Sequence, residues 1–170
     1  MVYLMQLSKP DIVRDWLPRY TGMALEEFGK LILLTNFTRY LEFFAGKFNA
    51  DIRGIGGPMQ AATSSHGITM INFGIGSANA ATIMDLLSAI SPHAVLFLGK
   101  CGGLRSQVKI GDFILPIAAV RGEGTGLDYY PIEVPALPSF RLHDFVGHEL
   151  VKAEKDSWTG VIYTTNRRVW

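Results

Sequence analysis

GIGSANAATIMDLLSAISPHAVLFLGKCGGLRSQVKIGDFILP, residues 74–116, is the stretch of sequence that decides the fold. A glycine turn, GIGS, opens it, and the apolar segment over 78–90 that follows has few polar positions and predicts a helix. The run HAVLFLG at 93–99 has the length of a buried strand, and a second glycine turn leads to another apolar stretch at 113–120. Strands that alternate with helices in this way favour an α/β sheet with helices on both faces.

The residues before this stretch extend the same pattern. The run KLILLT at 30–35 predicts a buried strand, and apolar residues at helical spacing over 37–48 predict a helix behind it. Residues 59–65 and 68–73 are two further strand candidates that flank Ser65-His66-Gly67, and this arrangement is typical of a hairpin.

The residues after it are less regular. Residues 121–138 are rich in Gly, Pro and Tyr, which predicts a long loop. A helix is expected over 140–155 and a last strand at 160–163, with a turn at 164–166.

We expect an N-terminal helical segment, residues 1–29, followed by one α/β domain over 30–170. Ser8 predicts the N-cap of a short amphipathic helix over 11–20. The expected architecture is a three-layer α/β/α arrangement with a mixed central sheet. We expect it to be truncated at its C-terminus, because the chain stops at Trp170 just after a core strand.

The composition excludes several classes of protein. With 170 residues, 48% of them hydrophobic and 18% charged, a packed globule is expected rather than a disordered chain. A net charge of +1 gives no electrostatic support for nucleic-acid binding, and no apolar run reaches the roughly 20 residues of a membrane span. The single cysteine, Cys101, fits a reducing compartment, and without a signal peptide the expected location is cytoplasmic. The histidines show no metal-ligand spacing with Cys101, so neither a metal nor a cofactor is expected.

The two glycine turns are candidate anion sites. Backbone N–H groups at the N-terminus of a helix attract anions, and we expect GIGS at 74–77 and GKCGG at 99–103 each to join a strand to a helix. A tight turn without a ligand is the simpler interpretation of each turn taken alone. Asn79 stands where the third glycine of a dinucleotide fingerprint belongs, and neither turn matches a phosphate loop, so dinucleotide binding is disfavoured.

Two arginines are placed where an anion could meet them. Arg39 lies in the first turn of the helix after strand 30–35 and can reach an anion above the C-terminal end of that strand. Arg53 lies in the glycine-rich loop 51–57. On residue type alone, a solvated surface arginine is the commoner interpretation of both.

Taken together, these stretches resemble the purine nucleoside phosphorylase and nucleosidase superfamily, over about residues 30–170. Residues 74–116 are similar to the glycine loop and helix, buried strand, G-x-C-G-G turn and G-D-hydrophobic strand of that family. LTNFTRY at 34–40 resembles the segment whose arginine grips phosphate, which implies this role for Arg39. The loop that carries Arg53 is similar to a segment that reaches into a neighbouring subunit's site, which implies a homo-oligomer, in this family a hexamer.

Two departures from the family pattern bear on the reaction. Most of the phosphorylases carry Arg and Ser where this chain has Phe97 and Lys100, so the usual site for inorganic phosphate is altered. That change favours hydrolysis over phosphorolysis and leaves basic groups for the 5′-phosphate of a nucleotide. The family's ribose-binding Met-Glu pair and the aspartate that protonates purine N7 would lie beyond Trp170, so no catalytic acid is assigned.

The resemblance therefore implies cleavage of the N-glycosidic bond of AMP to adenine and ribose 5-phosphate, with this chain alone inactive. The phosphate and sugar would contact Arg39, Arg53, Gly76, Ser77, Lys100, Cys101 and Gly102. The base would contact Glu123, on a loop that could close over it, Thr165, and Trp170, which could stack on adenine. Two alternatives stay open: a nucleoside phosphorylase, and a non-catalytic nucleotide-binding or oligomer-forming module that lacks the acid.

Overall fold

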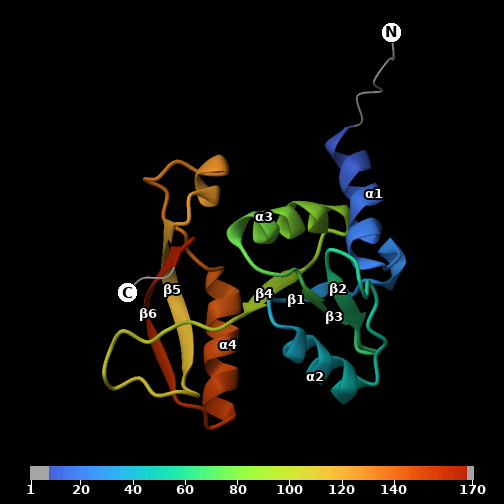
Figure 1. Ribbon diagram of the computed structural model, residues 1–170. Coiled ribbons are helices and arrows are strands. Elements are labelled where there is room, and N and C mark those ends of the chain that lie inside the picture. Colours follow the sequence, from blue (N-terminus) through green and yellow to red (C-terminus); the bar gives the residue numbers. More distant parts are fainter. Residues whose placement is uncertain (1–7, 168–170) are drawn as a thin grey trace. The chain divides into compact units, whose positions relative to one another are not determined.

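The computed structural model describes residues 8–167, and the chain divides into two compact units, one ending at Gly99 and the other beginning at Lys100 (Figure 1). Each unit has its own sheet. The first unit contains four strands in the order β2-β3-β1-β4, and the second contains the pair β5-β6.

The sheet of the first unit is mixed, as the sequence predicts. Its three parallel strands are β1 (Leu31–Thr35), β3 (Ile68–Asn72) and β4 (Ala94–Leu98), and β2 (Gln60–Thr63) is antiparallel to β3. Thr35 pairs in register with Asn72 on one side and Leu98 on the other. The three parallel strands therefore end at the same level and form one carboxyl edge.

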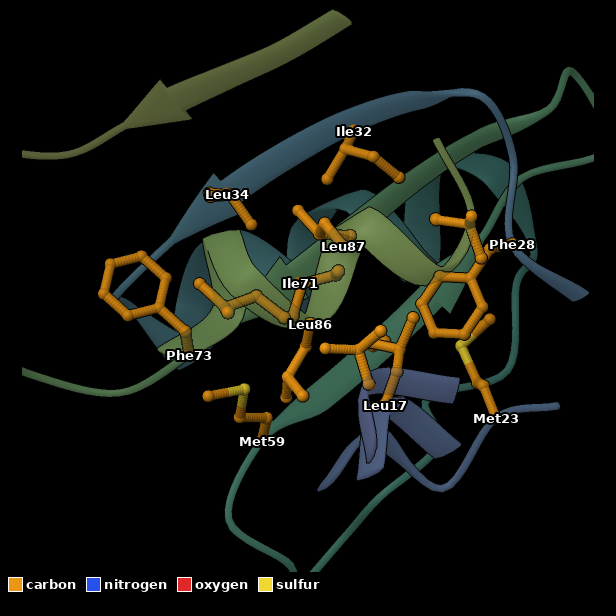
Figure 2. Close-up of a cluster of buried hydrophobic side chains, with 14 residues drawn as sticks. Leu17, Met23, Phe28, Ile32, Leu34, Met59, Ile71, Phe73, Leu86 and Leu87 are labelled. Atoms are coloured by element: carbon orange, nitrogen blue, oxygen red, sulfur yellow. The ribbon is translucent and has the colours of Figure 1, made fainter. Parts of the chain in front are cut away.

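Helices cover both faces of this sheet, so the predicted three-layer α/β/α arrangement is confirmed. On one face α1 (Lys9–Thr21) and α3 (Ser77–Leu86) pack on alternate residues of the strands, and Figure 2 shows this cluster around the fully buried Ile71. On the other face α2 (Thr38–Phe48) packs on the intervening residues, among them Met70. The alternation of apolar side chains along β3 gives it two buried faces, which is expected of a strand inside a parallel sheet.

The connections in the first unit follow local rules that the sequence shows. Ser8 caps α1, as predicted, and the structure adds a capping box with Asp11. The predicted hairpin between β2 and β3 is also confirmed: the N–H of Gly67 donates to the carbonyl of Ser64, and Gly67 has a φ of 72°, which favours glycine. Two short 3-10 helices, η1 (Leu25–Glu27) and η2 (Leu87–Ala89), complete the unit.

The second unit is a parallel strand pair with one helix. β5 (Phe113–Gly122) pairs with β6 (Ser157–Thr165), and α4 (Phe140–Lys152) packs on β5. A register shift falls between Pro116 and Ala118, because proline has no N–H to donate to the ladder. A 3-10 helix, η3 (Thr125–Asp128), lies in the long loop between β5 and α4.

Two sequence predictions are wrong in this unit. Thr164 and Thr165 do not form a turn but extend β6, because they pair with the last two residues of the long strand β5. The glycine turn at 99–103 does not open a helix: residues 100–112 contain turns and bends only, with no helix after the turn. Within residues 8–167, no helix is both long enough and apolar enough to cross a membrane.

Candidate functional site

The carboxyl edge of the first sheet carries the candidate site, because parallel α/β sheets bind ligands at this edge. The turn from β1 into α2 and the turn from β3 into α3 both begin here. The N–H of Phe73 donates to the carbonyl of Thr35 at 3.0 Å, so the two turns start as direct neighbours.

Arg39 lies on the first of these turns. It is the second residue of α2 and is exposed to solvent. The N-cap residue, Phe37, has no side-chain acceptor for the first N–H groups of α2, so the positive end of the helix dipole is left without a side-chain cap. A guanidinium beside such a helix end has the charge and the donors that a phosphate group requires.

The GIGS turn forms the second connection, and its backbone explains why glycine is needed. Gly74 and Gly76 have φ values of 79° and 109°, a region that strains residues with a side chain. Space remains open around Gly76, since an added Cβ would meet no atom within 4 Å. Ser77 is the first residue of α3, and Asn79 closes the turn by donating from Nδ2 to the carbonyl of Ile75 at 3.2 Å. A ligand atom could therefore approach the backbone of this turn closely.

A single side chain joins the two turns, and sequence reasoning missed it. Asn72, the last residue of β3, donates from Nδ2 to the hydroxyl of Thr38 on α2 at 3.1 Å. Its Oδ1 accepts from the N–H of Gly74 at 3.1 Å. An Asn between an apolar strand and a glycine turn is the signal that could have revealed it.

Arg53 lies beside a different hollow. Its backbone pairs with Ala61 of β2, and its guanidinium lies 3.8 Å from the carboxylate of Glu27. Both side chains are about half exposed, so this ion pair contributes little to stability. The hollow measures about 290 Å³, and the described residues that line it are Met23, Glu27, Asp51, Arg53 and Thr63. The residues of the two turns at the carboxyl edge are not among them.

The remaining predicted residues belong to the second unit. Lys100, Cys101 and Gly102 are exposed and lie in the irregular segment that precedes β5. Thr165 ends β6 and pairs with Gly122, so Thr165 and Glu123 lie at the same end of the β5-β6 pair. Trp170 lies outside the described residues.

Glu123 takes part in a loop that Arg121 holds in place. One carboxylate oxygen of Glu123 accepts from the N–H of Gly126 at 2.8 Å, and the other, Oε2, is buried without a partner among the described residues. The guanidinium of Arg121 donates to four backbone carbonyls at 2.6–3.1 Å, those of Gly126, Tyr130, Pro131 and Val134. The structure thus shows a fastened loop rather than an open lid around Glu123.

Asp112 is a titratable group of this unit whose pKa is shifted by its hydrogen-bond partners. Its carboxylate accepts from the backbone N–H of Lys109 at 2.9 Å and from the indole N–H of Trp158 at 2.7 Å. The Lys109 bond, and then the Trp158 bond, lower the pKa of Asp112 below its usual value. Asp112 precedes β5 and is therefore at the opposite end of the strand from Glu123, where it fastens the sheet.

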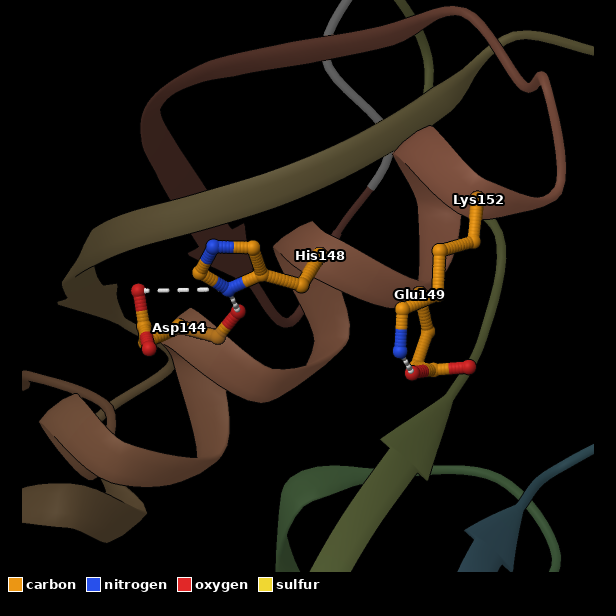
Figure 3. A network of polar contacts seen from close by, with 4 residues as sticks. All are labelled: Asp144, His148, Glu149 and Lys152. Atoms are coloured by element: carbon orange, nitrogen blue, oxygen red, sulfur yellow. Dashed lines mark hydrogen bonds and ion pairs between the residues drawn. The ribbon is translucent and has the colours of Figure 1, made fainter.

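The polar side chains of α4 pair with one another. Figure 3 shows His148 beside Asp144 and Lys152 beside Glu149, at 3.5 and 2.6 Å. Pairs at such spacing are ordinary features of an exposed helix. Across the described residues, no cluster of three or more His, Cys, Asp or Glu side chains could hold a metal ion.

The chain shares this fold with solved proteins that are named for reactions on nucleosides and nucleotides. The model of the phosphorylase superfamily matches residues 25–170, and the chain belongs to this superfamily. In sequence the chain is 28% identical to the AMP nucleosidase of Escherichia coli, over 91% of the chain and 41% of that protein. It is 33% identical to the guanosine phosphorylase of Halorubrum lacusprofundi, over 47% of the chain and 34% of that protein.

Solved structures give the same result. The crystal structure of AMP nucleosidase from Bacteroides thetaiotaomicron is 56% identical, with a TM-score of 0.93 over 96% of this chain and 71% of that one. The purine nucleoside phosphorylase of Toxoplasma gondii is 16% identical with a TM-score of 0.75, which shows the shared fold alone. The chain spans 41% of the length of the curated AMP nucleosidase that it matches.

Proposed function

We propose that this chain forms part of an enzyme that hydrolyses the N-glycosidic bond of AMP to adenine and ribose 5-phosphate. The observation that carries the proposal is the pairing of two turns, one with Arg39 and one with Gly76, at the carboxyl edge of the sheet. The 56% identity to an AMP nucleosidase structure supports AMP as the substrate.

The proposed roles follow from the chemistry of the reaction. Arg39 and the N–H groups around Gly76 and Ser77 would bind the 5′-phosphate, since a guanidinium can form paired, charge-assisted bonds to it. In the second unit, Lys100 would add positive charge, and the segment that it shares with Cys101 and Gly102 would supply backbone N–H groups.

Cleavage also needs an acid that protonates the departing purine and groups that stabilise the cationic sugar. Glu123 accepts from the N–H of Gly126 through one carboxylate oxygen, and its other oxygen has no hydrogen-bond partner among the described residues. Asp112 accepts from the indole N–H of Trp158 at the far end of β5. The family resemblance assigns the acid to neither of these residues, so we expect it outside these 170 residues. We expect this chain alone to release adenine at no useful rate. Glu123, Thr165 and Trp170 stay proposed contacts of the base.

An adenine-release assay tests the proposal. A longer natural chain that contains these residues should release adenine from AMP in phosphate-free buffer and give ribose 5-phosphate, while the 170-residue chain should not. A strict requirement for inorganic phosphate would instead support a nucleoside phosphorylase, the kind of enzyme for which several relatives are named. No release by the longer chain under either condition would favour a non-catalytic nucleotide-binding module.

We also propose a homo-oligomer, a hexamer by resemblance, in which Arg53 approaches a neighbour's site. The exposure of about half of the Arg53 side chain leaves it accessible to a second copy. Light scattering at micromolar concentration should show an assembly, and a stable monomer would contradict this proposal.

A further inference from the structure

We infer that Asn72 is a positioning residue, which sets the two anion-binding turns in one fixed arrangement by bonding to Thr38 and Gly74. This inference rests on the proposed function for its consequence, nucleotide binding. The geometry on which it stands belongs entirely to the first unit.

The orientation of the Asn72 amide follows from its partners. The N–H of Gly74 can only donate, so the oxygen of the amide must face it, at 3.1 Å. The Nδ2 group is then left to donate to the hydroxyl of Thr38, also at 3.1 Å. One planar amide thereby connects the first residue of α2 with the first glycine of the GIGS turn.

Because Asn72 is buried, the loss of either bond would be costly in free energy. Asn72 is 9% exposed, and it is the last residue of β3, a strand whose core side chains are all but sealed from solvent. A buried amide without partners is costly, so the arrangement that satisfies both ends is favoured over those that do not. Because Thr38 is next to Arg39, and Gly74 opens the turn that ends at Gly76, the amide sets the spacing between the proposed phosphate contacts.

A structural role alone would affect stability and leave ligand preference unchanged, and this difference defines the test. Thr38→Val removes the hydroxyl and keeps the shape, whereas Thr38→Ser keeps a hydroxyl. Asn72→Leu removes both amide bonds at similar volume. Ser64→Ala is the matched control: Ser64 is 4% exposed and its hydroxyl accepts from Ile68, at the other end of β3.

Two measurements on the 170-residue chain are combined. Calorimetry with AMP and with adenosine gives the preference for the phosphorylated ligand. Amide hydrogen exchange over residues 36–39 and 74–77 reports on the two turns directly, without any ligand. We expect Asn72→Leu and Thr38→Val each to lower the preference for AMP about tenfold, the size of one net hydrogen bond, and to speed exchange in both turns.

Thr38→Ser and Ser64→Ala should keep the preference within about twofold. The double variant should lose no more than Asn72→Leu alone, because Asn72→Leu already removes the bond to Thr38. An unchanged preference in Thr38→Val and Asn72→Leu would overturn the inference, and if Asn72→Leu fails to fold, Thr38→Val, at an exposed residue, decides alone. If the parent chain does not prefer AMP, the proposed function fails, and amide exchange in the two turns decides the inference. Faster exchange in Asn72→Leu and Thr38→Val would support the positioning role of Asn72, and unchanged exchange would refute it.

Discussion

The two units of this chain differ in how far their apolar side chains are buried. In the first unit, apolar side chains from helices and strands are sealed in two clusters on either side of a four-stranded sheet. In the second, no residue over 100–167 is buried, and large apolar side chains such as Leu104, Ile110 and Phe140 lie more than 80% exposed. A sheet of two strands with one helix has too little apolar area to enclose a core.

This difference in burial indicates which of the proposed ligand contacts are held in place by a packed core. The proposed phosphate contacts Arg39, Gly76 and Ser77 lie on turns that a sealed core supports, and such support is what holds a binding geometry. Glu123 and Thr165, the proposed base contacts, lie on a unit whose large apolar side chains are exposed to solvent. We expect the phosphate half to be preorganised and the base half to depend on further protein.

The largest expected effect on the free energy of unfolding comes from replacing isoleucine by alanine, a change that can be made once in each unit. Ile71→Ala removes a fully buried side chain from the first core and should lower the free energy of unfolding by about 2–5 kcal/mol. Ile110→Ala changes a fully exposed side chain and should alter it by less than about 0.5 kcal/mol.

Urea unfolding followed by circular dichroism measures both variants against the parent chain. Equal losses in the two variants would show that the second unit has a core of its own in solution, and the contrast between the units would then be wrong.

An intermediate effect on stability is expected at Arg121, whose guanidinium fastens the loop between β5 and α4. Arg121→Ala removes four bonds to backbone carbonyls of residues 126–134. Because the loop lies at the surface, we expect a local loss of about 1 kcal/mol, visible as several-fold faster amide exchange within 124–134. Arg141→Ala, at an exposed arginine on α4, serves as control, and equal exchange in both variants would show that the loop holds its shape by other contacts.

The smallest effect concerns pH and Asp112. The pKa of Asp112 in the folded chain lies below the usual value for an aspartate, about 3.8, chiefly because of the N–H of Lys109, so the stability it contributes is present above that usual value. This contribution is lost as the pH falls through the lower folded pKa, when the bond from Trp158 weakens. The indole N–H resonance of Trp158 should therefore titrate with a midpoint below 3.8, and Asp112→Asn should abolish the titration. A midpoint above 3.8 would contradict the lowered pKa.

The sequence predicts the first unit better than the second, for a physical reason. Where a segment is buried on a known face, its apolar pattern is dictated by packing, and strand KLILLT, the helix behind it and the hairpin at Ser65-His66-Gly67 were all predictable. In the second unit no residue over 100–167 is buried, so the apolar pattern carries less information, and the turn expected at Thr165 is strand instead.

The contacts made by Arg121 and Asn72 were not predicted, because the sequence gives little indication of their partners. Arg121 binds carbonyls of the main chain, which every residue carries, so its partners have no characteristic side chain. Asn72 bonds to Thr38 across 34 positions of the chain, and only the sheet register brings them together. The glycines of GIGS, by contrast, were informative because a positive φ restricts the residue type.

The most direct test of the account is the affinity of the 170-residue chain for AMP and adenosine, measured by calorimetry in the parent and in Arg39→Ala. If the phosphate half of the site is built within the first unit, the parent should bind AMP more tightly than adenosine. Arg39→Ala should then lose about 1.5–3 kcal/mol of AMP binding, the range for a hydrogen bond to a charged group, and leave adenosine binding unchanged. Equal affinity of the parent for the two ligands would contradict the account.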